Sequence, residues 1–241
     1  MDVLNHFGWD KDVTVIGYSM GGSIAVHLNG EQPDLIANLI LLAPAGMIRP
    51  GRFGFDKFSY FRSGFLSLED REERLKERIL GDIKKFQEAR RAEITNPQDS
   101  EGAILRTAVI ESREWFINNH KGFLHAVAES TSEAPLFSRV GGLGTVAKFL
   151  SGTDQSEAWK KLRSRKPGTT TIILGRGDDK INHKEFRADV IEKRNGGLCL
   201  EDNIRLEILP KGADGKEADH HLPMTRAPDV LEIIESALGM K

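Results

Sequence analysis

Three polar side chains in distant parts of the sequence have the types that nucleophilic catalysis needs. Ser19 is the centre of a Gly-x-Ser-x-Gly motif, Asp178 follows one apolar run, and His220 follows a later one. A serine hydroxyl attacks a carbonyl efficiently only when a base removes its proton, and an acid holds that base in one orientation. The three side chains therefore predict acyl-transfer chemistry, provided that the fold brings them together.

The surroundings of Ser19 favour this chemistry over an ordinary turn. The stretch "VTVIG", residues 13–17, predicts a buried strand, and residues 20–30 predict a helix. A serine on a tight strand-to-helix turn is presented to substrate, and the Met20 N–H at the start of the helix would stabilise a developing oxyanion. A glycine-lined turn without chemistry is the alternative interpretation of the motif.

The same turn leads to predictions about packing. We expect Gly17 and Gly21 to avoid side chains that would collide where strand and helix meet, and Gly22 to extend that permissive stretch. We also expect Ile24, Ala25 and Leu28 to form the inward face of the helix, because apolar residues recur there at helical spacing.

The candidate acid and base each have a neighbour of the same type. "ILGRGDDKI" places Asp178 and Asp179 just after a predicted strand, and "ADHHLPM" places His220 and His221 after the next one. In an open parallel sheet, the loops at the carboxyl ends of the strands lie at one edge, so these side chains can converge on Ser19. Asp179 remains the alternative acid, and His221 the alternative base.

The elements that would position these residues alternate between strand and helix patterns. Such alternation predicts an α/β fold with a mostly parallel sheet and helices on its faces. The expected strands are 13–17, 38–42, 169–175 and 204–210, with a charged helix from Ser67 to Arg91, helices over 104–120 and 121–130, a loop over 136–156 and a terminal helix after Pro228.

Composition excludes several classes of protein. The 241 residues carry a net charge of −2, which gives no reason to expect a nucleic-acid partner. No apolar run approaches the roughly 20 residues that span a bilayer, so no integral membrane segment is expected. Cys199 is the only cysteine, which rules out an internal disulfide. The cellular compartment and the oligomeric state remain open.

Three stretches, "VIGYSMGG", "ILGRGDDKI" and "DHHLPMTRAPDVLEIIE", resemble the α/β-hydrolase superfamily, in the serine hydrolases of the abhydrolase-1 type. The resemblance implies Ser19 as nucleophile, Asp178 as acid, His220 as base and Met20 in the oxyanion hole, with no metal or organic cofactor. It also implies a core of residues 1–46 and 168–241 and a helical cap or lid of residues 47–167. Asp219 stands where the family usually has glycine.

The resemblance further implies that this chain corresponds to the C-terminal half of a hydrolase core, truncated before the first predicted strand. Strand 13–17 would then be an exposed apolar edge, and the second oxyanion donor would be absent. The expected function is hydrolysis of carboxylic esters or related acyl bonds in a small-molecule substrate, and the many apolar residues of the lid favour an apolar acyl group. An acyltransferase on the same triad, or an inactive remnant that acts as a binding protein, are the alternatives.

Overall fold

The chain is described from a computed structural model. The description covers residues 4, 6–49, 66–93, 101–133, 155–192, 197–212, 215 and 217–240. The chain forms two compact units, one of Met1–Arg52 with Pro135–Lys241 and the other of Phe53–Ala134. All of the candidate site residues belong to the first unit.

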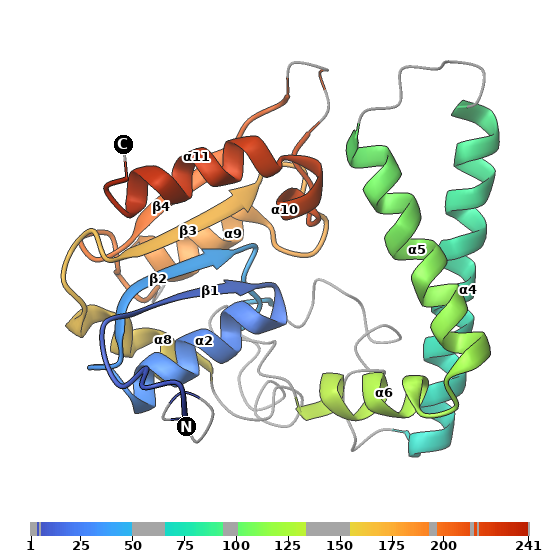
Figure 1. Cartoon of the computed structure of the whole chain (residues 1–241), viewed down its shortest axis with the longest axis horizontal. Helices are drawn as coiled ribbons and strands as arrows, with labels where there is room; N and C mark the ends of the chain where they lie inside the picture. The colour runs from blue at the N-terminus through green and yellow to red at the C-terminus, as the bar shows by residue number, and fades with distance from the viewer. Residues whose placement is uncertain are drawn as a thin grey trace. The chain divides into compact units, whose positions relative to one another are not determined.

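The first unit contains a parallel sheet in the order β1-β2-β3-β4 (Figure 1). Its strands are β1 (Val13–Tyr18), β2 (Ile36–Leu42), β3 (Thr170–Gly175) and β4 (Arg205–Leu209). β-Branched and leucine-rich runs suit parallel strands that are covered on both faces, and every residue of β3 is buried. The predicted α/β class and mostly parallel sheet are confirmed.

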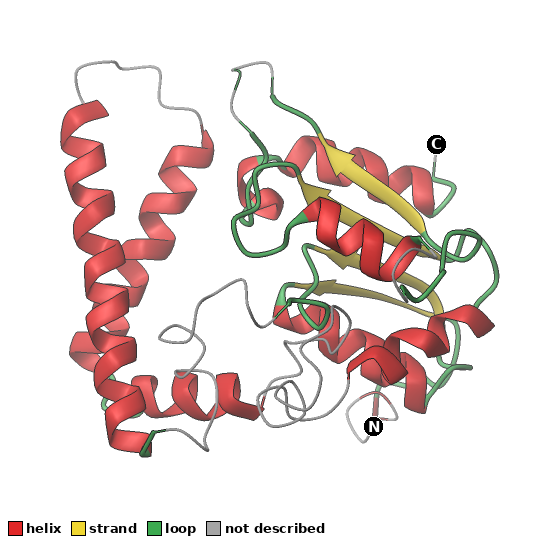
Figure 2. Cartoon of the chain, turned by 180° about the vertical axis from the view of Figure 1, so that it is seen from behind, coloured by secondary structure: helices red, strands yellow, loops and turns green. Residues whose placement is uncertain are grey.

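Helices lie on both faces of this sheet. The terminal helix α11 (Ala227–Ala237) lies in front of the sheet in Figure 1, whereas α9 (His183–Phe186) lies in front of it in the reverse view of Figure 2. The remaining described helices of this unit are α2 (Met20–Glu31), α8 (Gln155–Lys160), η2 (Lys161–Ser164), η3 (Arg187–Ile191) and α10 (Leu222–Thr225).

The buried face of α2 differs from the predicted one. The buried residues recur at helical spacing and include Gly22, Ala25, Val26 and Asn29. Ile24 is 52% exposed. The predicted burial of Ala25 is therefore confirmed, and the predicted burial of Ile24 is wrong. α2 packs against β1 and β2, and its buried residues include the small Gly22 and Ala25.

The second unit is built from α4 (Leu68–Glu93), α5 (Glu101–Asn119) and α6 (Phe123–Glu133). The predicted start of the charged helix is confirmed, because the Asp70 N–H donates to Ser67 Oγ at 3.1 Å in a capping arrangement. Buried Arg71 joins α4 to α6 by donating to the Ala128 carbonyl and to Glu129 Oε1. The role of this unit as a cap stays a prediction.

The predicted insertion, residues 47–167, is longer than this helical unit. α8 and η2 group with the sheet because they contact α2. Gln155 of α8 hydrogen-bonds His27, and Lys161 of η2 donates to the Gly30 carbonyl at 3.1 Å. Most of the predicted loop over 136–156 lies outside the described residues, and Gln155 and Ser156 begin α8.

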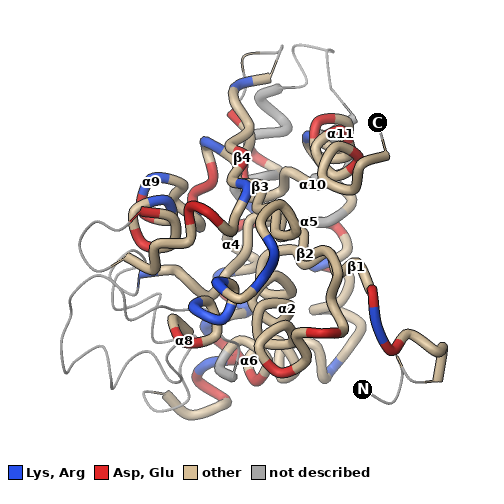
Figure 3. The backbone as a smooth tube through the Cα atoms, turned by 90° about the vertical axis from the view of Figure 1, so that its left-hand side faces the viewer, with Lys and Arg blue, Asp and Glu red and all other residues tan. Residues whose placement is uncertain are grey.

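Charge and hydropathy along the described elements agree with the composition. Acidic and basic residues are interspersed along the tube of Figure 3, for example around α9, in keeping with the small net charge. Among the helices in the described ranges, none combines the length and the apolar character that crossing a bilayer requires.

Candidate active site

Ser19 occupies the turn between β1 and α2 in a strained backbone conformation. Its φ of 51° and ψ of −118° lie where residues other than glycine are seldom found. Such a conformation costs on the order of 1–3 kcal/mol and persists only where the surroundings enforce it. The Ser19 N–H donates to the Leu42 carbonyl at 2.9 Å, and the Ser19 carbonyl accepts from the N–H groups of Gly22 and Ala45. The backbone bonds therefore hold the turn against its strain.

Of the two motif glycines that we expected to permit this turn, only one packs closely. A Cβ at Gly17 would lie 2.7 Å from the Gly21 carbonyl oxygen, so that prediction is confirmed. A Cβ at Gly21 would meet nothing within 4 Å, whereas one at Gly22 would lie 2.7 Å from Pro44 Cβ. The prediction for Gly21 is wrong, and Gly22 is the glycine that lets α2 approach the segment after β2.

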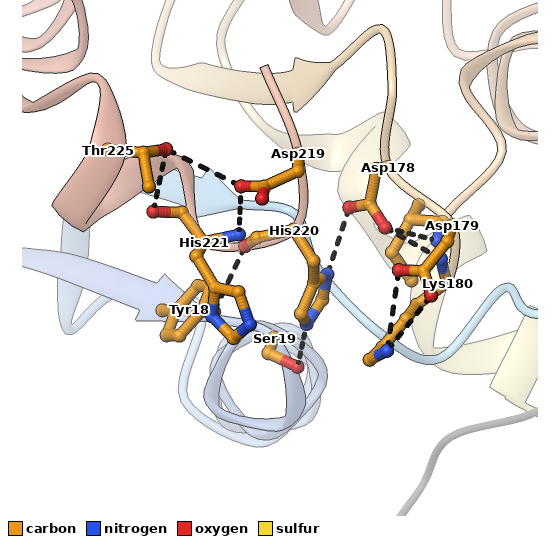
Figure 4. A network of polar contacts seen from close by, with 10 residues as sticks. Tyr18, Ser19, Asp178, Asp179, Lys180, Asp219, His220, His221 and Thr225 are labelled. Atoms are coloured by element: carbon orange, nitrogen blue, oxygen red, sulfur yellow. Dashed lines mark hydrogen bonds and ion pairs between the residues drawn. The ribbon is translucent and has the colours of Figure 1, made fainter. Parts of the chain in front are cut away.

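Ser19, His220 and Asp178 form one hydrogen-bonded chain (Figure 4). Ser19 Oγ lies 2.9 Å from His220 Nε2, and His220 Nδ1 lies 2.9 Å from Asp178 Oδ2. The side chains of His220 and Asp178 are only 8% and 0% exposed. With Nδ1 donating to the carboxylate, Nε2 is left as the acceptor for the serine hydroxyl proton.

Asp178 is itself held in one orientation by the loop that follows β3. Its Oδ1 accepts hydrogen bonds from the N–H groups of Lys180 and Ile181, both at 2.8 Å. These bonds hold the carboxylate so that Oδ2 is turned toward His220. The loop therefore buries the Asp178 side chain and orients its carboxylate.

The neighbouring residues of like type lie outside this chain of bonds. The Asp179 side chain is 76% exposed and pairs with Lys180 at 3.3 Å. His221 directs Nδ1 toward the Tyr18 hydroxyl, at 3.5 Å, rather than toward Ser19. The geometry therefore brings together Asp178 and His220, and not the alternative acid and base.

Met20 is the first residue of α2, so its N–H belongs to the turn whose donors have no acceptor within the helix. The helix dipole adds partial positive charge at the same point. The Ser19 side chain does not cap α2 and instead reaches His220. An oxyanion formed at Ser19 would therefore meet the amino-terminal end of a helix.

Two residues of the site were missed by the sequence interpretation or given no role there. Tyr18 donates its hydroxyl hydrogen to the His220 carbonyl at 3.0 Å, and the Asp219 carboxylate accepts from the His221 N–H at 2.9 Å. The sequence signal for Tyr18 was its position next to Ser19. The sequence signal for Asp219 was that it replaces the glycine that the family usually has there.

Comparison with known proteins agrees with the resemblance drawn from the sequence. Residues 2–100 match a family model described as alpha/beta hydrolase fold. Over a stretch of 36 residues the chain is 50% identical to "Lipase LipV" of Mycobacterium tuberculosis. This stretch is 15% of this chain and 14% of that protein.

Two solved structures resemble almost the whole chain. The 2-hydroxy-6-oxo-6-phenylhexa-2,4-dienoate hydrolase of Rhodococcus sp. strain RHA1 has a TM-score of 0.54 at 14% identity, covering 98% of this chain and 66% of that one. An α/β hydrolase enzyme from a Medee basin deep-sea metagenome library has a TM-score of 0.52 at 15% identity, covering 99% and 68%. The chain thus spans about two thirds of the length of these structures, and the likeness is one of fold.

Proposed function

We propose that this chain, which has the α/β-hydrolase fold and matches that family's model over residues 2–100, is a serine hydrolase that cleaves carboxylic esters or related acyl bonds. The observation that carries the proposal is the continuous chain of hydrogen bonds from Ser19 Oγ through the His220 imidazole to Asp178 Oδ2.

In the first half of the reaction, Ser19 Oγ attacks the carbonyl carbon of the ester while His220 Nε2 takes the hydroxyl proton. The 2.9 Å contact between these atoms is the distance that proton transfer needs. The buried Asp178 carboxylate keeps Nδ1 protonated and stabilises the imidazolium that forms.

The negative charge that develops on the carbonyl oxygen would be stabilised by the Met20 N–H at the start of α2. When the tetrahedral intermediate collapses, the bond to the leaving alcohol breaks and His220 returns its proton to that oxygen. Water then attacks the acyl-enzyme with the same base, which releases the acid and restores the Ser19 hydroxyl.

The relatives support the reaction class more than the substrate. The protein with related sequence is named as a lipase and the one with related fold as a dienoate hydrolase, so both names describe hydrolysis. Because the chain spans about two thirds of the matched structures, the substrate of the whole protein is itself a proposal. We propose a small acyl ester, with an apolar acyl group as in a lipase substrate.

The test is labelling of the purified chain with a fluorophosphonate probe, which reacts only with an activated serine. Ser19→Ala should abolish labelling, and His220→Ala should slow it by about 10³-fold or more, since the hydroxyl then lacks its base. His221→Ala is the matched control, and it should slow labelling far less than His220→Ala. Undiminished labelling of either Ser19→Ala or His220→Ala would refute the assignment.

A second measurement separates hydrolysis from transfer. Turnover of a p-nitrophenyl ester should release free carboxylic acid in the presence of added alcohols. Preferential formation of a new ester with a given alcohol would instead identify the enzyme as an acyltransferase on the same triad.

A further inference from the structure

We infer that Tyr18 is a positioning residue, which together with Asp219 holds the peptide group between His220 and His221 and thereby fixes the base relative to the nucleophile. This inference rests on the proposed function, because it assigns His220 as the base. The geometry shows this peptide group held at both ends. Its carbonyl accepts the Tyr18 hydroxyl hydrogen at 3.0 Å, and its N–H donates to Asp219 Oδ1 at 2.9 Å.

The position of Tyr18 in β1 explains how it reaches the histidine loop. Successive residues of a strand point to opposite faces, so Tyr18 points away from the face on which Gly17 contacts α2. Its ring lies 5.5 Å from the His220 ring, centroid to centroid, in a tilted arrangement. Figure 4 shows Tyr18 and Ser19 approaching the histidine segment from the same end of β1.

Tyr18 therefore adds a second connection beside the bond that participates in the chemistry. The contact between Ser19 Oγ and His220 Nε2 is lost when Oγ becomes acylated, because the hydroxyl proton has then left. The contact between Tyr18 and the His220 carbonyl involves none of the atoms that react. It keeps the imidazole near the acyl-enzyme, where the same base must next activate water.

Asp219 completes the arrangement from within the loop. Its Oδ1 accepts the His221 N–H and lies 3.4 Å from Thr225 Oγ1, which joins the loop to the end of α10. This is a function that a glycine at position 219 could not provide, since glycine has no side-chain acceptor. An asparagine would retain an acceptor oxygen, and an alanine would not.

The principal test compares Tyr18→Phe with Thr14→Val. Both changes remove one hydroxyl from the same face of β1, but only Tyr18 contacts the histidine loop. Loss of one positioning hydrogen bond should lower kcat by about tenfold in Tyr18→Phe, with KM unchanged, because orientation rather than substrate binding is impaired. Thr14→Val should keep the kcat of the unmodified protein. Equal kcat values for the two variants would overturn the inference.

A second background distinguishes positioning from a general effect on the turn. In a His220→Ala protein the base is already absent, so adding Tyr18→Phe should not change the residual rate of probe labelling. A further tenfold loss in that background would mean that Tyr18 acts on the Ser19 turn and not through His220, and would refute the inference. Asp219→Ala should behave as Tyr18→Phe does, and Asp219→Asn should recover most of the loss.

Proton NMR provides a readout that does not depend on turnover. The His220 Nδ1 proton, hydrogen-bonded to Asp178, should give a strongly downfield resonance that disappears in Asp178→Asn. Tyr18→Phe should broaden or shift this resonance, and Thr14→Val should not. If the resonance is missing from the unmodified protein, the proposed triad fails. If it is present and unmoved by Tyr18→Phe, only the inference about Tyr18 fails.

Discussion

The Gly177 N–H donates a 2.8 Å hydrogen bond to the Ala218 carbonyl oxygen, and this contact joins the loop after β3 to the loop after β4. Asp178 comes next after Gly177, and His220 comes shortly after Ala218, so the contact sets the separation of Asp178 and His220. A Cβ at Gly175 would lie only 2.3 Å from the same carbonyl oxygen. The two loops therefore approach at a distance that a residue with a side chain would not permit.

The first prediction concerns this approach. Gly175→Ala should force the loops apart, because the new Cβ would overlap backbone atoms that cannot rotate away. We expect probe labelling to slow by at least about tenfold, since a displacement near 1 Å impairs proton transfer to that extent or more. The melting temperature, measured by circular dichroism, should fall as well.

The matched control is Gly81→Ala in α4, where a Cβ would meet nothing within 4 Å. Alanine favours a helix over glycine by up to about 1 kcal/mol, so this variant should be at least as stable as the unmodified chain. Unchanged labelling and melting in Gly175→Ala would show that the loops are not tightly joined.

The second prediction concerns the choice between two adjacent carboxylates. Asp178→Asn should lower kcat by about 10⁴-fold, because the amide no longer holds the imidazole in the required tautomer. Asp179→Asn should have little effect, since that side chain is 76% exposed and pairs with Lys180. Steady-state turnover of a p-nitrophenyl ester measures both, and the reverse ranking would move the acid by one residue.

Much of the sheet and of the candidate site could be predicted because the signals are local. β-Branched runs predicted β1 and β3, and the motif around Ser19 predicted a turn whose strain is visible in its φ of 51°. The parallel arrangement then implied that the loops after β3 and β4 would meet at the same edge as Ser19. The contacts among Ser19, Asp178 and His220 follow from that topology.

What sequence reasoning missed depends on which atoms meet in three dimensions. Spacing alone could not tell which face of α2 is covered, so Ile24 was placed inside although it is 52% exposed. Gly21 belongs to the Gly-x-Ser-x-Gly motif and Gly22 does not, yet Gly22 is the one that packs closely, because it lies against Pro44. α8 was missed because its few residues carry no resolvable helical period, and its place is set by contacts with α2.

The third prediction concerns Arg165, which is 8% exposed and lies beside the amino ends of β2 and β3. Its guanidinium donates to Asn29 Oδ1, to Thr170 Oγ1 and to the carbonyls of Ile36, Ala37 and Thr169. Burial lowers the pKa of Arg165 from its ordinary value. The side chain nevertheless stays charged, because the guanidinium pKa lies far above neutral pH.

Arg165→Met should lower the free energy of unfolding by about 3 kcal/mol, because several buried acceptors lose their donor at once. For a chain of this size the melting temperature should fall by roughly 6–12 °C. Arg165→Lys should recover only part of the lost stability, since an ammonium cannot reproduce the planar fork of donors of a guanidinium.

The control is Arg187→Met, at an exposed position in η3, which should melt within about 2 °C of the unmodified chain. Equal melting of Arg165→Met and Arg187→Met would contradict the proposed importance of the buried guanidinium.

The last prediction concerns β1, which is an edge strand of the described sheet and carries Ile16 at 51% exposure. An edge strand presents backbone donors and acceptors to other chains, and an exposed apolar side chain on it favours strand-to-strand association. Ile24 of α2 offers a closely matched comparison, because it is 52% exposed but belongs to a helix whose backbone groups are paired internally.

If association proceeds through the strand edge, Ile16→Lys should slow aggregation by about tenfold, because a charge on an edge strand blocks pairing. Light scattering at fixed protein concentration measures this rate. Ile24→Lys should slow it much less, and neither change should move the melting temperature by more than about 2 °C, as both positions are at the surface. An equal slowing by the two variants would mean that exposed apolar surface in general, and not the edge of β1, drives the association.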